Sequence, residues 1–94
     1  MPKASWEGVV LAESEKCVVV EGNQYFPRES INQEYFRASK ETTECPWKGT
    51  ANFYDIVVNE QINSNAAWYY ANPSKAAAQI KDRVAFWKGV KIES

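Results

Sequence analysis

The sequence predicts a mainly β fold, built as one small domain over residues 1–94 with antiparallel strands around an aromatic-rich interior. Three observations support this prediction. The chain has 94 residues, which is enough for one hydrophobic core but too few for two. Its apolar segments are short and rich in β-branched residues, and turn-forming residues separate them, as is typical of strands. Four Trp, five Tyr and four Phe supply large rigid surfaces for packing.

Three strands are expected in the first part of the chain. Residues 6–11 and 17–20 are apolar runs with a polar interval of turn length between them, so we expect them to pair as a hairpin. Gly22 and its neighbours end the second run. Residues 24–26 resume extended character before Pro27, which predicts a third strand.

The segment that follows Pro27 is less regular. Residues 30–38 carry apolar side chains four and five positions apart, which suits one or two helical turns with Ser30 as the N-cap. Residues 40–44 are polar and contain two threonines, a composition that fits either an edge strand or a loop. Pro46 and Gly49 bracket an expected turn.

The second half of the chain contains the clearest strand. Residues 50–58 place apolar side chains on both faces, so we expect a central strand there. A polar connection of seven residues, 59–65, leads to a returning strand at 66–70. Trp68 and Tyr70 share one face of this returning strand.

A short helix and a last hairpin complete the expected fold. Asn72 and Pro73 form a favourable helix start before an alanine-rich stretch, which predicts a short helix near residues 73–81. Residues 84–87 and 90–92 flank a Lys-Gly pair, which predicts a hairpin with a compact turn.

Composition excludes several classes of function. The chain has no histidine, so it cannot form a Ser-His-Asp or Cys-His catalytic site. Two cysteines without histidine cannot supply four ligands for a structural zinc ion. No metal site and no cofactor are therefore predicted. Eleven basic and twelve acidic residues give a net charge of -1, so we expect no binding to nucleic acid.

The same composition gives an expectation for the location of the protein. No apolar run is long enough to span a bilayer, and the first residues lack the apolar core of a signal peptide. We therefore expect a cytoplasmic protein without membrane contact, in which Cys17 and Cys45 are reduced thiols.

Four segments together resemble domain-of-unknown-function family 427. They follow one another over nearly the whole chain, and they are Val20–Pro27, Cys45–Ala51, Ala66–Tyr70 with Pro73, and Val84–Phe86. The resemblance implies a β-tent-like arrangement, in which antiparallel sheets meet at a steep angle and enclose a cleft. The family is sometimes given a nucleotidyltransferase-type label. Such chemistry holds catalytic metals with clustered carboxylates, and the chain has no Asp-x-Asp or Asp-x-Glu pattern. The sequence therefore does not predict nucleotidyl transfer.

The first functional hypothesis is a binding module with an aromatic cleft. The residues expected to line this cleft supply several rings, one ammonium and one carboxylate: Glu21, Trp47, Lys48, Tyr54, Trp68 and Tyr70, with Tyr25 as a neighbour. Stacking and one charge contact would hold a small metabolite or a modified side chain. The alternative for each ring is that it fills the core. The alternative for Glu21 is that it is a surface carboxylate or a salt-bridge partner of Lys48.

Two other hypotheses remain open from the sequence. In the first, the protein is an enzyme with Cys45 as a nucleophile or redox thiol, Lys48 lowering the thiol pKa and Glu21 handling protons. Its alternative is that Cys45 is a packing residue beside a proline turn. In the second, the protein is an interaction domain that uses a sheet edge or an exposed aromatic patch and has no small-molecule site. The oligomeric state is not predicted.

Overall fold

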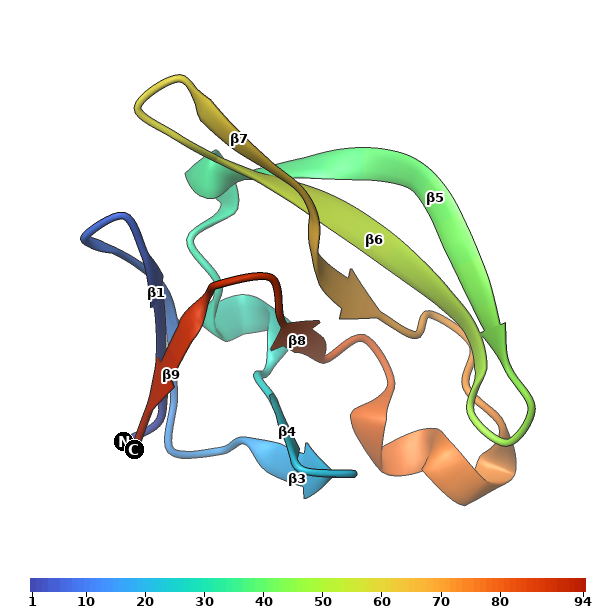
Figure 1. The fold of residues 1–94 in the computed structure, drawn as a ribbon. Coiled ribbons are helices and arrows are strands. Elements are labelled where there is room, and N and C mark those ends of the chain that lie inside the picture. The colour runs from blue at the N-terminus through green and yellow to red at the C-terminus, as the bar shows by residue number, and fades with distance from the viewer.

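Nine strands form three antiparallel sheets, and three short 3₁₀ helices lie in the connections (Figure 1). The computed structural model describes residues 1–94. The strands are β1 (Lys3–Trp6), β2 (Val9–Glu13), β3 (Val18–Val20), β4 (Asn23–Tyr25), β5 (Phe36–Cys45), β6 (Gly49–Val58), β7 (Gln61–Tyr69), β8 (Val84–Phe86) and β9 (Lys91–Glu93). The helices are η1 (Arg28–Ser30), η2 (Gln33–Tyr35) and η3 (Lys75–Ile80). The predicted class, mainly β with antiparallel sheets and little helix, is confirmed.

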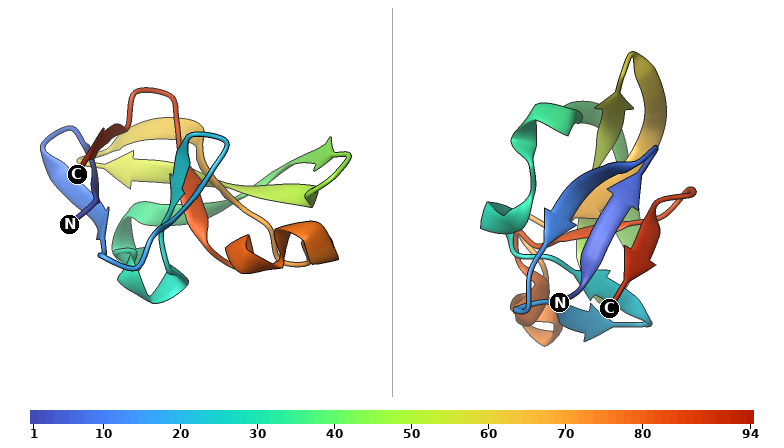
Figure 2. Two further views of the ribbon diagram at one scale, coloured as in Figure 1. Left: turned by 90° about the horizontal axis from the view of Figure 1, so that it is seen from below. Right: turned by 90° about the vertical axis from the view of Figure 1, so that its left-hand side faces the viewer.

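The largest sheet has four strands in the order β5-β6-β7-β8. A three-stranded sheet has the order β2-β1-β9, and β3 pairs only with β4. Because β1 lies between β2 and β9, the first and last strands of the chain are direct neighbours. The two termini accordingly lie side by side in both views of Figure 2. Each end of the chain therefore supplies backbone hydrogen bonds that hold the other.

Tight turns set the strand pairing in the first part of the chain. Glu7 and Gly8 have φ of 51° and 77°, and Glu21 and Gly22 have φ of 52° and 80°. Two successive residues with positive φ are the signature of a two-residue type I′ hairpin turn. The first turn joins β1 to β2 and the second joins β3 to β4. The predicted hairpin between residues 6–11 and 17–20 is therefore wrong, because a turn interrupts the first of these runs.

A third turn of this kind lies in the second half of the chain, where the sequence predicted a polar connection over residues 59–65. Asn59 and Glu60 have φ of 49° and 69°, and they join β6 directly to β7. The polar residues that follow are therefore part of a strand and not a seven-residue connection. They are mostly exposed, since the ends of β6 and β7 extend beyond the core as a hairpin (Figure 1). The strands predicted at 50–58 and 66–70 are confirmed as parts of β6 and β7, although Tyr70 itself follows the end of β7.

For the hairpin predicted between residues 84–87 and 90–92, the compact turn is confirmed but the pairing of the two strands is wrong. Lys88 and Gly89, with φ of 54° and 88°, form the expected compact turn between β8 and β9. The two strands then separate, because β8 pairs with β7 and β9 pairs with β1. The segment thus connects the four-stranded sheet to the three-stranded sheet.

The predicted helical segments are shorter and tighter than expected. The helix near residues 73–81 is the 3₁₀ helix η3, whose N-cap is Ser74 and which is kinked at Ala77. Within residues 30–38, η1 ends at Ser30 and η2 is a separate turn, so Ser30 does not begin a helix. The strand β5 already starts at Phe36 and includes residues 40–44. Of the two alternatives for those residues, the edge strand is correct.

Both faces of the four-stranded sheet are covered, and their two groups of buried side chains are distinct. One face, the Tyr54 face, carries Tyr54, Ala67 and Phe86, which pair across β6, β7 and β8. It packs with Leu11 of β2 and with Phe26. The opposite face, the Phe53 face, carries Phe53, Trp68 and Ala85. It packs with residues of β3, β4 and η3, namely Val20, Tyr25, Ala77 and Ile80.

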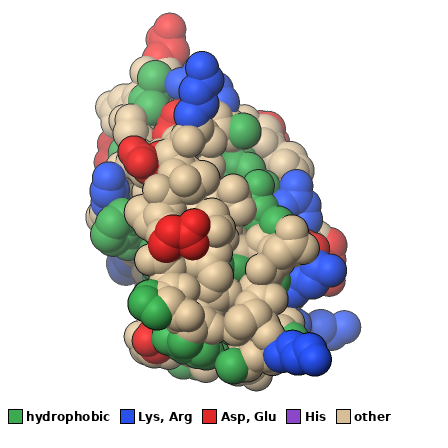
Figure 3. Space-filling view, turned by 90° about the vertical axis from the view of Figure 1, so that its right-hand side faces the viewer, with side chains coloured by type: hydrophobic (Ala, Val, Ile, Leu, Met, Phe, Trp, Pro, Cys, Tyr) green, Lys and Arg blue, Asp and Glu red, His purple; other side chains and the backbone are tan.

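Charged side chains of both signs are interspersed with hydrophobic ones on the surface over β5 and the β5–β6 turn (Figure 3). Neither sign covers this side of the molecule. The longest helical element, η3, has six residues, and the structure contains no helix with the length and apolar character needed to cross a bilayer.

Candidate functional site

An open pocket of about 150 Å³ lies on the Phe53 face of the four-stranded sheet. Cross-strand pairing explains its composition. Phe53 pairs with Trp68, and Thr43 of β5 pairs with Ala51, so all four side chains point to the same side of the sheet. The complete lining is Thr43, Lys48, Ala51, Phe53, Trp68, Tyr70 and Trp87.

Lys48 is the only buried charged residue of the protein, with 7% of its surface exposed. It lies in the turn between β5 and β6, and its Nζ lies 5.4 Å from the centroid of the Trp47 ring and 5.6 Å from that of the Tyr70 ring. Both distances are within the range of cation–π attraction. The sequence thus places an ammonium group among aromatic rings at the wall of the pocket.

The turn that carries Lys48 is fixed against the start of η3. The backbone N–H of Ser74 donates to the carbonyl oxygen of Lys48 at 2.9 Å, and the Ser74 hydroxyl donates to the carbonyl of Trp47. Gly49 has φ of 114°, and a Cβ there would lie 3.3 Å from the carbonyl oxygen of Asn72. Only glycine suits this conformation and this close approach, so the Lys-Gly sequence is what allows the turn to dock.

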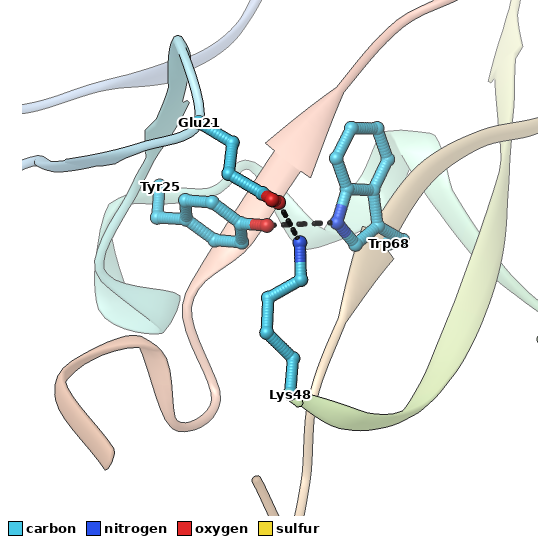
Figure 4. A network of polar contacts seen from close by, with 4 residues as sticks. All are labelled: Glu21, Tyr25, Lys48 and Trp68. Carbon is cyan, nitrogen blue, oxygen red and sulfur yellow. Dashed lines mark hydrogen bonds and ion pairs between the residues drawn. The ribbon is translucent and has the colours of Figure 1, made fainter. Parts of the chain in front are cut away.

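Glu21 reaches Lys48 from the turn between β3 and β4. The Lys48 ammonium donates a hydrogen bond to the Glu21 carboxylate, and the two groups form an ion pair (Figure 4). The carboxylate side chain is half-exposed, at 53%, whereas the Lys48 side chain is 9% exposed. The pair therefore has one partner fixed in the protein and one partner facing solvent.

The pKa values of this cluster reflect the ion pair. The hydrogen bond from Lys48 lowers the pKa of Glu21 below its ordinary value of 4.5. Burial by itself lowers the pKa of Lys48, but the hydrogen bond to Glu21 and the nearby Tyr25 and Tyr70 outweigh it, so the pKa lies above 10.5. Burial raises the pKa of Tyr70. Lys48 is thus an ammonium and Glu21 a carboxylate at neutral pH.

Tyr25 and Trp68 form the wall beside this ion pair. The indole Nε1 of Trp68 donates to the Tyr25 hydroxyl at 3.2 Å, and the two rings meet edge to face with centroids 6.3 Å apart (Figure 4). Tyr25 is fully buried, so it holds Trp68 from behind and does not line the pocket itself. This contact fixes the orientation of the Trp68 ring.

Most of the predicted site residues converge. The contacts described above form two adjacent groups, one of Glu21, Trp47, Lys48 and Tyr70 and the other of Tyr25 and Trp68, and three of these residues, Lys48, Trp68 and Tyr70, line the pocket directly. The residues that sequence reasoning missed are Thr43, Ala51, Phe53 and Trp87. Alternation along β6 contained a signal for Ala51 and Phe53, because the two share a face of that strand.

Tyr54 does not join the pocket. It lies on the opposite face of the sheet, where it stacks on Tyr69 with ring centroids 5.0 Å apart and accepts a hydrogen bond from Arg28 Nη1 at 3.0 Å. Phe36 also meets its ring edge to face. Since neighbouring residues of a strand point to opposite faces, Phe53 takes the position in the pocket that the sequence analysis gave to Tyr54.

Cys45 ends β5 and packs, half-buried, against the side chains of the Phe53 face. It pairs with Gly49 across the turn and does not line the pocket. No hydrogen bond joins its thiol to Lys48, whose ammonium is bound to Glu21. Cys17 is likewise a free thiol, and burial raises its pKa.

The arrangement has the elements of a small binding site. Aromatic rings supply apolar surface, and one ammonium supplies a charge and hydrogen-bond donors. Nucleotidyl transfer would require a set of carboxylates able to hold catalytic metal ions. The structure contains no group of three or more His, Cys, Asp or Glu side chains placed to hold a metal, so the residues do not fit that chemistry.

Comparison with known proteins adds one finding. A family model described as a domain of unknown function (DUF427), whose short name is of a nucleotidyltransferase type, matches residues 3–94. The match spans all four segments that resemble the family, including those with Glu21 and Lys48. No curated protein matches the chain.

Proposed function

The chain belongs to the DUF427 family, which is described without an activity, and from this premise we propose that it is a binding module whose pocket on the Phe53 face holds a small molecule or a modified side chain. The observation that carries the proposal is the position of Lys48. Its ammonium is buried at the wall of an open aromatic pocket, and its one ion-pair partner is the half-exposed carboxylate of Glu21, so a charged hydrogen-bond donor stands beside the open space.

The lining suits recognition better than packing alone. A side chain that only filled the core would leave no open volume, whereas Phe53, Trp68, Tyr70 and Trp87 surround about 150 Å³. Binding sites in proteins combine apolar walls with a few convergent polar groups. Their usual volumes are roughly 300–1,000 Å³, so this pocket suits a single ring or one group of a larger molecule.

A substitution on β5 tests the proposal. Thr43→Trp would fill the pocket, because Thr43 lines it from an exposed position on the edge strand. The matched control is Thr42→Trp, which adds the same side chain on the other face of the same strand. The measurement is a metabolite screen by ¹H–¹⁵N NMR, in which the indole N–H signals of Trp68 and Trp87 report binding.

We expect ligands found with the natural protein to bind the Thr42→Trp variant and to lose binding to the Thr43→Trp variant. A screen without a ligand that moves those two indole signals would contradict the proposal. So would ligands that bind the Thr43→Trp variant unchanged, because they would then occupy another surface.

Other expectations from the sequence stay predictions. These are the cytoplasmic location, the reactive-thiol alternative for Cys45 and the interaction-domain alternative. The structure offers no base or ammonium bonded to the Cys45 thiol, so binding is the function we favour.

A further inference from the structure

The ion pair at the pocket wall is unequal in how firmly its two partners are held. The backbone of Lys48 is fixed by the hydrogen bond that its carbonyl oxygen accepts from Ser74 and by the docked turn at Gly49, and its side chain is 9% exposed. Glu21 lies at the tip of a two-residue turn, and its side chain is 53% exposed. Glu21 can therefore turn into solvent with little loss of packing, whereas the Lys48 side chain would lose its buried contacts if it left the pocket wall.

The Lys48 ammonium has unused capacity for hydrogen bonding. An ammonium group carries three donors, and Glu21 is the single acceptor that Lys48 contacts in the protein. The rings of Trp47 and Tyr70 lie beside it, and Tyr25 is also near. An acceptor that entered the pocket would therefore find a charged donor in place.

The charge of the wall also selects against one class of ligand. Aromatic pockets often hold methylated ammonium groups through cation–π attraction. In this pocket Lys48 itself occupies the faces of Trp47 and Tyr70, and a second cation beside it would be repelled. The sign of the buried charge thus favours an anionic ligand.

The rings define the shape of the ligand. Trp68 and Trp87 meet edge to face with centroids 5.8 Å apart, Phe53 lies 6.3 Å from Trp87, and all three rings line the open pocket. A flat ring makes the largest contact with such walls. The volume of about 150 Å³ limits the buried part of the ligand to about one ring.

We propose that the pocket recognises a planar ring that carries a carboxylate, and that this carboxylate replaces Glu21 as the partner of Lys48. The inference rests on the proposed binding function and specifies its ligand class. Glu21 then acts as an internal competitor that neutralises the buried ammonium while the pocket is empty. No covalent step is involved.

Three probes of the same ring test this proposal: benzoate, neutral benzamide and cationic phenyltrimethylammonium. Each is titrated into the natural protein and into Glu21→Gln, with the Trp68 and Trp87 indole signals as the readout. The control is Glu7→Gln, because Glu7 has the same turn position before glycine and nearly the same φ, 51° against 52°, without contact to Lys48.

We expect benzoate to bind the natural protein more tightly than benzamide does and phenyltrimethylammonium not to bind. Glu21→Gln should strengthen benzoate binding about ten-fold. A neutral amide binds the Lys48 ammonium less strongly than the Glu21 carboxylate does, so benzoate has a weaker competitor. Glu7→Gln should leave it unchanged. If Glu21→Gln fails to fold, Glu21→Asp, whose shorter side chain weakens the contact with Lys48, should show the same direction of change.

Two results would overturn the inference. One is binding of phenyltrimethylammonium as tight as that of benzoate, and the other is benzoate binding that Glu21→Gln leaves unchanged or weakens. Failure of all three probes would also overturn it. The proposed binding function is judged separately, by the metabolite screen with the Thr43→Trp variant, so the two failures are distinguishable.

Discussion

The two faces of the four-stranded sheet are both rich in aromatic rings, but only one of them is closed. On the Tyr54 face, ring centroids lie 5.0 to 5.9 Å apart, in the pairs Tyr54–Tyr69, Phe36–Tyr54, Phe26–Phe86 and Phe36–Phe86. On the Phe53 face, the spacing is 5.8 to 6.3 Å, in the pairs Trp68–Trp87, Tyr25–Trp68 and Phe53–Trp87. Every pair on the Phe53 face includes a tryptophan, and this face also holds the pocket and the buried ammonium.

We infer from this difference that the two faces of the sheet have different roles, one in stability and the other in recognition. Close-packed rings gain dispersion contacts on all sides, and an open pocket gives some of these contacts up. A buried lysine adds a further cost, because its charge must be taken out of water. The Tyr54 face should therefore contribute more to folding, and the Phe53 face should contribute more to binding.

The largest expected effect is the loss of a ring from the closed side. Phe26 is fully buried and lies 5.6 Å from Phe86, so Phe26→Ala should lower the free energy of unfolding by about 3–5 kcal/mol. Trp87 is 47% exposed at the pocket, and Trp87→Ala should cost about 1 kcal/mol or less. Urea denaturation measures both. Equal losses would contradict the division between the faces.

A smaller effect compares one hydroxyl on each face. Tyr25→Phe removes the acceptor of the Trp68 indole in a buried position, and it should cost about 1–2 kcal/mol. Tyr54→Phe removes the acceptor of Arg28, which is exposed and can bond to water instead, so the loss should stay below about 1 kcal/mol. Urea denaturation of the two variants tests the order, and a larger loss for Tyr54→Phe would refute it.

The sequence analysis placed Tyr54 in the cleft, and this prediction failed because it assigned Tyr54 to the wrong face of the sheet. Alternation correctly separates Tyr54 from Phe53, but it does not say which of them lies beside Trp68. That depends on register, and register depends on the turn. A connection over residues 59–65 would pair Val58 with Ala66 and put Tyr70 across from Tyr54. The two-residue turn at 59–60, together with the register shift between Tyr54 and Ile56, puts Phe53 across from Trp68 instead.

Other parts of the site were predictable because they lie in short segments with their own signals. Glu21-Gly22 and Lys48-Gly49 each join a charged residue to a glycine at a strand end, and both are turns in the structure. Their ion pair was foreseen only as one alternative, since 27 residues separate the two side chains and only the packing of β3 and β4 against the sheet brings them together. Trp87 was missed although it alternates with Ala85 on the same face.

Replacement of the buried ammonium should affect stability little and binding strongly. In Lys48→Met, a flexible apolar side chain fills a similar volume and the half-exposed Glu21 returns to water, so the stability should change by less than about 1 kcal/mol. Lys88→Met is the control, because Lys88 also lies over a tryptophan, 5.1 Å from the Trp87 centroid, but in an exposed position. Calorimetric unfolding and the benzoate titration together measure the two effects. A large loss of stability in Lys48→Met would show that the ammonium is mainly structural.

The smallest expected effect is the pH dependence of the same ion pair. The pKa of Glu21 is lowered from 4.5 in the folded state, so its stabilisation is present above pH 4.5 and is lost as the pH falls through the lowered value. The pKa of Lys48 is raised from 10.5, so its stabilisation is present below pH 10.5 and is lost as the pH rises through the raised value. The difference in unfolding free energy between the natural protein and Lys48→Met should therefore be flat between these limits and fall at both ends. A slope near neutral pH, measured by urea denaturation of both proteins, would mean that another titrating group controls the pocket wall.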